Sequence, residues 1–315
     1  MKMRSTNPWP IWVIAVGNFF ILFLGTEAYQ SPLSSFLAQM ALPLFCLSIL
    51  NFCCLFLLGH WKLTLFPLLG LVSMFLKVKP NLVDHWPELA SGRSHEILQF
   101  NLRGSSEGNL KFLPERILGK KIQILTVQSC SSKCFSFLSN SLAKEGYYSV
   151  FHETAQLSIF SKFPLVQPEL KTAPNAIIAR FQIKETQLGT LINVELPKSW
   201  PWGVAITQGQ HLKQLETWVY DIKMPLVVAG NFNLVPWSES LRSLRQLLHF
   251  GAPNLRTLPY GNGPATLFDL ELPSPFSLIL WDQIYFSKHF KFEAQKTVGL
   301  RGADFFPVAN SFELK

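Results

Sequence analysis

The N-terminal quarter of the chain is far more apolar than the remainder. Residues 9–76 consist mainly of Leu, Phe, Ile and Val, and their only charged side chains are Glu27 and Lys62. A membrane-spanning helix needs about 20 predominantly apolar residues. The longest run meets this length, while the two shorter ones need flanking Trp residues at the membrane interface. We therefore predict about three transmembrane helices, in the apolar runs 11–25, 36–59 and 63–76.

The charges of the connecting loops predict an orientation for these helices. Lys2 and Arg4 precede the first run and Lys62 separates the second from the third, whereas the loop 26–35 has only one charge, which is acidic. The positive-inside rule then places the N-terminus in the cytoplasm and the C-terminal part outside it. Two lysines just after the third run argue against this orientation. A signal peptide in the first run is disfavoured, because no small-residue cleavage site follows it.

The composition changes near residue 93, where apolar and polar residues begin to alternate as in a globular domain. We divide the chain into a membrane region at 1–79, a linker at 80–94 and a domain at 95–315. The domain has 22 Lys and Arg against 17 Asp and Glu, and this excess suits an anionic partner. Because the basic residues are scattered, a nucleic-acid surface is only weakly supported. Cys130 and Cys134 are the only cysteines of the domain, which indicates neither a zinc site nor a disulfide framework.

Short strand-like runs follow one another through the domain. Two helices are predicted between them, at 210–222 with one apolar stripe and at 238–249 with Ser238 as N-cap. Many strands with few helices favour an α/β (α+β) sandwich of packed sheets over a doubly wound parallel sheet. The predicted strands are 97–101, 122–128, 148–152, 157–160, 176–183, 190–196, 226–229, 282–286 and 308–314.

The segment "VVAGNFNLVPWS" has the layout of a catalytic strand end. An apolar run of strand length ends at Gly230 in a polar tripeptide, and an amphipathic segment follows. Asn231 and Asn233, however, are amides where metal and phosphate chemistry usually places a carboxylate.

Seven segments in order resemble the motifs of the endonuclease/exonuclease/phosphatase superfamily. They are "ILQFNLR", "IQILTVQS", "LSIFSKFPL", "LINVELP", "VVAGNFNLVPWS", "LILWDQIYFS" and "GADFFPVANSFEL". The resemblance covers about residues 95–315 and implies a deoxyribonuclease-I-like four-layer sandwich that hydrolyses phosphoesters with Mg²⁺. A membrane-spanning N-terminus before such a domain is similar to a bacterial subgroup of the family. This similarity implies a bacterial inner-membrane protein, and the positive-inside rule places its domain outside the cytoplasm.

Four positions match the family's functional residues. The resemblance implies that Asn101 is the first metal-shell Asn and Asn233 the phosphate-contacting Asn. Asp282 matches the Asp that orients a His, and Asp304 matches the Asp of the terminal Ser-Asp-His. Judged without the resemblance, Asn101, Asn233 and Asp282 are explained equally well by a binding role and by capping loops and satisfying backbone groups at strand ends.

Four other positions depart from the family pattern. Ser129 replaces a metal-binding Glu, Glu195 a His, Asn231 the water-positioning Asp, and Phe305 the terminal His. A positioned acid or base contributes about 10²- to 10⁴-fold to a rate, so these losses would remove most of the acceleration.

Two hypotheses follow from this degenerate pattern. The favoured one is a pseudoenzyme that binds a phosphate-bearing ligand or a protein. The alternative is a weak or altered phosphodiesterase or phosphatase whose Mg²⁺ is held by Asn101, Glu195 and Asp304. Under either hypothesis, all eight positions should converge at one end of the strand layers.

Overall fold

The structure is a computed structural model. It describes residues 41–57, 94–102, 113–120, 122–184, 187–198, 202–236, 238–250, 282–293 and 307–315, with a few positions within 64–72, at 111, within 266–271 and at 296–297.

A seven-stranded mixed sheet, here called the first sheet, begins the domain. Its order is β13-β15-β1-β2-β4-β3, and β14 also pairs with β15. β1 and β2 are parallel, with Asn101 beside Gln128, and the other pairs are antiparallel. The strands are β1 (His95–Asn101), β2 (Ile124–Gln128), β3 (Tyr148–His152), β4 (Leu157–Ser161), β13 (Phe290–Phe292), β14 (Lys296–Thr297) and β15 (Val308–Leu314).

A second sheet of six strands has the order β5-β6-β7-β8-β12-β9. β7 and β8 are parallel, and β12 runs antiparallel to β8. The strands are β5 (Leu165–Thr172), β6 (Asn175–Lys184), β7 (Gln187–Glu195), β8 (Leu226–Asn231), β9 (His249–Phe250) and β12 (Asp282–Phe286). A separate hairpin joins β10 (Thr266–Leu267) to β11 (Leu270–Glu271).

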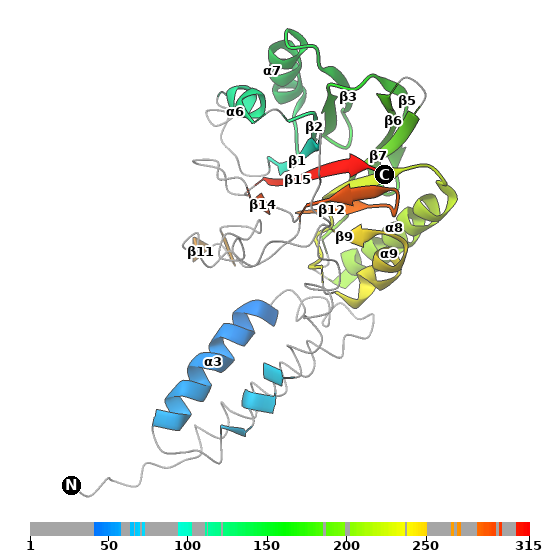
Figure 1. Cartoon of the computed structure of the whole chain (residues 1–315). Coiled ribbons are helices and arrows are strands. Elements are labelled where there is room, and N and C mark those ends of the chain that lie inside the picture. Colours follow the sequence, from blue (N-terminus) through cyan, green and yellow to red (C-terminus); the bar gives the residue numbers. More distant parts are fainter. Residues whose placement is uncertain are drawn as a thin grey trace, which may run out of the picture.

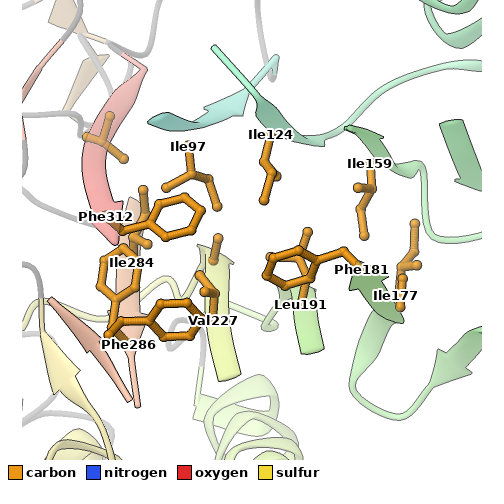
Figure 2. Close-up of a cluster of buried hydrophobic side chains, with 14 of the residues drawn as sticks. Ile97, Ile124, Ile159, Ile177, Phe181, Leu191, Val227, Ile284, Phe286 and Phe312 are labelled. Carbon is orange, nitrogen blue, oxygen red and sulfur yellow. The ribbon is translucent and has the colours of Figure 1, made fainter. Parts of the chain in front are cut away.

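The two sheets pack face to face over the central core. Figure 2 shows Ile97, Ile124 and Ile159 of the first sheet above Leu191 and Val227 of the second. Because alternate residues of a strand point to opposite faces, the intervening positions face outward, where helices cover them.

Helices cover the outer face of each sheet, which gives four layers (Figure 1). α6 (Leu113–Gly119) and α7 (Ser132–Ala143) bury their apolar side chains against the first sheet. α8 (Trp202–Asp221), the 3₁₀ turn η1 (Glu239–Leu241) and α9 (Arg242–Leu247) pack on the second sheet. The expected sandwich of packed sheets is therefore confirmed.

Part of the predicted membrane region is described. α3 (Ala41–Leu57) is an uncharged helix of 17 residues within the run 36–59. In the described part of the chain, no helix combines the length and apolar character needed to cross a membrane. The predicted span 11–25, half of the positions of the span 63–76 and the linker residues 80–93 lie outside the described residues.

Some element boundaries differ from those read in the sequence. The helix predicted at 210–222 begins at Trp202. The helix predicted at 238–249 is shorter, because Leu248 is extended and His249 already pairs in β9. Ser238 does occupy the N-cap position, before the 3₁₀ turn η1 and in an extended conformation, but its hydroxyl makes no capping hydrogen bond. The sequence patterns do not predict the helices α6 and α7, the strand β5 or the short strands β9, β10, β11, β13 and β14.

Candidate active site

On five strands of the two sheets, the inward-facing side chains change from apolar to polar near the same end of the sandwich. Inward-facing positions alternate along a strand, so Gln99 and Asn101 continue the row of the core residue Ile97 on β1. The corresponding polar positions on the other strands are Gln128 on β2, Asn193 and Glu195 on β7, Asn231 on β8 and Asp282 on β12.

Strand pairing brings these positions side by side. In the second sheet Asn231 lies opposite Glu195 on one neighbour and Asp282 on the other. In the first sheet Asn101 lies opposite Gln128, and Ser129 follows directly. The six described positions of the predicted site therefore lie at one end of the two sheets. Asp304 and Phe305 lie outside the described residues.

A buried chain of amides joins the two sheets at this end. Gln99 Nε2 donates to Gln128 Oε1 at 2.5 Å, and Gln128 Nε2 donates to Asn193 Oδ1 at 2.5 Å. Asn193 Nδ2 in turn donates to the carbonyl oxygens of Val127 and Ser158, at 3.2 and 2.9 Å. The three amide side chains are fully buried. Since a buried polar group is costly unless it is hydrogen-bonded, this chain fixes the relative position of the strand ends.

The Gly-Asn-Phe-Asn segment is a tight backbone turn. Gly230 has a φ of +156°, and a Cβ there would lie 1.9 Å from the carbonyl oxygen of Val194. Asn233 has a left-handed φ of +50°, a conformation that Asn tolerates better than most residues. Gly230 and Asn233 are thus residue types that suit the backbone conformation at their positions.

Both asparagines of this turn bond to nearby backbone. Asn231 Oδ1 accepts from the backbone N–H of Asn233 at 2.8 Å, and Asn233 Nδ2 donates to the carbonyl oxygen of Leu196 at 2.6 Å. From α8, Gln208 Nε2 donates to the carbonyl oxygen of Pro197 at 2.7 Å. The turn is therefore held against the end of β7, and the two side chains act as structural groups.

Asp282 is a fully buried carboxyl at the centre of the strand ends. Burial raises its pKa well above the usual range, the side-chain amide of Gln99 lowers it in part, and the negative charge of Glu195 raises it further. Burial and the neighbouring carboxylate both disfavour the charged form. Asp282 therefore differs from a freely ionised carboxylate.

Ser129 stands where the family pattern has a metal-binding Glu. It is half-buried and has a left-handed φ of +54°. Its hydroxyl is neutral, while Mg²⁺ prefers carboxylate oxygens. Among the described residues, no three His, Cys, Asp or Glu side chains form a group that could hold a metal ion. Among the six described positions, only Glu195 and Asp282 carry a carboxyl group, so the described residues alone do not complete a Mg²⁺ site.

Comparison with known proteins decides the family. The model of the endonuclease/exonuclease/phosphatase family matches residues 98–305, a range that contains all eight positions of the predicted site. The chain belongs to the endonuclease/exonuclease/phosphatase family. Membership in this family supports a phosphoesterase-type function. A comparison with curated protein sequences finds no match.

Solved structures of this family share the fold. A family protein from Bacteroides thetaiotaomicron is 14% identical, with 71% of this chain and 99% of that chain covered and a TM-score of 0.57. The human Nocturnin catalytic domain with a bound sulfate anion is 19% identical, with 70% and 94% covered and a TM-score of 0.53. A mannosyl-6-phosphatase from B. thetaiotaomicron is 14% identical, with 70% and 100% covered and a TM-score of 0.55. At these identities the likeness shows the fold alone.

The buried amides Gln99 and Asn193 were missed in the sequence, although a signal for them was present. Each lies two residues after a core residue of the same strand, Ile97 and Leu191. A polar residue at an inward-facing position of a strand needs a partner. The same change at the ends of several strands indicates one shared polar site.

Proposed function

We propose that this domain is a pseudoenzyme of the endonuclease/exonuclease/phosphatase family, which binds a ligand without hydrolysing it. The observation that carries the proposal is the hydrogen bonding of Asn231, at the position of the water-positioning acid. Its side-chain oxygen accepts from the backbone of Asn233 within a buried turn. An amide in that role has little basicity toward a water molecule.

The neutral amide side chains near the ends of β1, β2 and β7 support this proposal. The fully buried amides of Gln99, Gln128 and Asn193 bond to one another and to backbone carbonyl oxygens. Such a network stabilises the scaffold of the family site without supplying the charge that phosphoryl transfer needs.

The proposed ligand is a phosphate-bearing molecule or a protein partner, bound at the rim of the former site. Two structural relatives support the first choice, since one is a phosphatase and the other holds a sulfate anion. The domain's modest excess of basic residues suits an anion.

We also propose that residues 1–79 anchor the protein in a bacterial inner membrane and that the domain is extracytoplasmic. α3 supports an anchor because its 17 residues carry no charge. Large apolar side chains on it are exposed, among them Leu50, Phe56 and Leu57. A bilayer would remove these side chains from water.

A second candidate is a rebuilt metal-dependent phosphoesterase. The negative charge of Glu195 acts on the Asp282 carboxyl, so two acidic groups lie near each other at the site. With Asn101 and Asp304, Glu195 would then provide the oxygen ligands for Mg²⁺.

A metal titration of the full-length chain separates the two candidates. Mn²⁺ and Mg²⁺ are titrated by calorimetry into the native chain, Glu195→Gln and the matched surface control Glu239→Gln. The pseudoenzyme proposal predicts no saturable heat up to millimolar metal in all three proteins. Saturable binding that is lost in Glu195→Gln and kept in Glu239→Gln would establish the rebuilt site.

A further inference from the structure

A pocket of about 330 Å³ lies on the outer face of the second sheet, at the C-terminal end of α8. Thr190 contributes to it from the start of β7, whereas Glu195 at the end of the same strand belongs to the candidate active site. Five residues of extended strand separate the two by about 16 Å. The pocket is therefore distinct from the candidate active site.

The pocket is lined by apolar side chains and by one hydroxyl group that makes no hydrogen bond. Ile178, Trp218, Ile222 and Met224 supply the apolar surface. Thr190 is 3% exposed, and its Oγ1 has no hydrogen-bond partner. A buried hydroxyl without a partner carries a desolvation cost, which a polar atom of a ligand would relieve.

The charges of the acidic and basic side chains that line the pocket do not sum to zero. Three basic and two acidic residues line the pocket, a net excess of one positive charge. Lys171 pairs with Glu169 at 2.7 Å. Lys223 Nζ donates to the carbonyl oxygen of Tyr220 at 2.7 Å and lies 4.3 Å from the centre of the Tyr220 ring.

Arg180 is the cation best placed to meet an anion. Its Nη1 donates to Gln167 Oε1 at 3.2 Å, and a guanidinium has five N–H donors in a planar fork that matches a carboxylate. Gln167 lies at a bulge of β5 and has a left-handed φ of +48°. Strained backbone and bulges often re-aim side chains at functional sites.

We propose that this pocket binds a small aromatic carboxylate. The ring lies against Trp218 and its aliphatic neighbours, the carboxylate meets the fork of Arg180, and a polar atom reaches the hydroxyl of Thr190. A monoanion neutralises the single excess positive charge of the pocket, whereas the second negative charge of a phosphate monoester finds no further excess to neutralise it.

Calorimetric titration of the full-length chain with 2-naphthoate tests this proposal. We expect saturable one-site binding that Arg180→Gln weakens about tenfold or more, the loss of one charge-assisted contact. Thr190→Val should weaken it by a smaller factor. Arg242→Gln, which removes an exposed guanidinium on α9, should leave binding unchanged.

Two further ligands test the class of compound. The neutral 2-naphthamide and the more highly charged 2-naphthyl phosphate should both bind at least several-fold more weakly than 2-naphthoate. Equal binding of the amide, no saturable binding of 2-naphthoate, or binding that is unchanged in Arg180→Gln would each overturn the proposal. Thermal melts check that every variant is folded. Since the pocket is distinct from the candidate active site, failure here would leave the proposed pseudoenzyme untouched.

Discussion

Asn231 and Gly230 each help to shape the end of β8. The amide of Asn231 keeps the turn because its oxygen accepts the same backbone N–H that a carboxylate would accept. Gly230 keeps the turn because no side chain fits against Val194. The shape of this strand end therefore does not require a carboxylate at position 231.

Gly230→Ala should destabilise the domain by about 2–4 kcal/mol, through the Cβ clash and the strained φ. Denaturant unfolding measures the change. The matched control is Gly209→Ala, at an exposed position of α8 with no atom near its would-be Cβ. It should stabilise the protein by about 0.5–1 kcal/mol, because alanine favours a helix. Equal effects of the two changes would contradict this description of the turn.

The pKa of Asp282 predicts how stability depends on pH. Its folded-state pKa is raised, by burial first, so the folded protein binds more protons than the unfolded chain above the usual Asp pKa of about 3.9. The contribution of Asp282 to stability therefore falls as pH rises from that value toward the folded pKa, by up to about 1.4 kcal/mol per pH unit.

Asp282→Asn should remove this slope. Unfolding free energies of the two proteins, measured from pH 4 to pH 8, should differ increasingly in favour of the variant as the pH rises. Parallel pH profiles would show that Asp282 is ionised in the folded state.

Placing the family's side chains at all four departing positions together should create phosphodiesterase activity. The variant Ser129→Glu, Glu195→His, Asn231→Asp and Phe305→His should gain Mg²⁺-dependent hydrolysis of bis(p-nitrophenyl) phosphate. Each single change should do little, because catalytic groups that act as a unit are not additive. A folded but inactive fourfold variant would show that these four side chains are not what the site lacks.

At the scale of elements, the start of α7 contrasts with the start of the η1–α9 segment. Ser131 caps α7, and its side chain accepts from the backbone N–H of Cys134 at 3.2 Å. Ser238 stands at the corresponding place before η1 but makes no such bond. Ser131→Ala should cost about 1 kcal/mol of unfolding free energy, and Ser238→Ala about 0.5 kcal/mol or less. Denaturant melts that rank the two in the opposite order would contradict these assignments.

Sequence patterns located most strands but not every helix or edge. β8, at the centre of the second sheet, begins with a continuous apolar run of four residues and could be recognised. β5 could not, because it is an edge strand with mostly exposed residues and a bulge. α7 was missed because four serines are interspersed among its apolar residues, and its buried stripe consists only of Cys134, Leu138 and Leu142.

At the scale of the whole molecule, the order of the motifs predicted more of the fold and of the candidate site than any single element did. The sandwich and the convergence of Asn101, Glu195, Asn231 and Asp282 follow from strand ends that carry polar residues in a fixed order. The amide chain through Gln99 and Asn193 depends on contacts between the sheets. Such contacts join residues far apart in sequence, so no local pattern revealed them.

We propose that the domain keeps the family scaffold without performing the family reaction. The most direct measurement is steady-state hydrolysis of bis(p-nitrophenyl) phosphate by the unmodified full-length chain with Mg²⁺, compared with the same protein in EDTA and with Asp304→Ala. We predict equal, background rates in all three. Robust Mg²⁺-dependent turnover by the unmodified chain that Asp304→Ala abolishes would contradict the claim and establish a rebuilt active site.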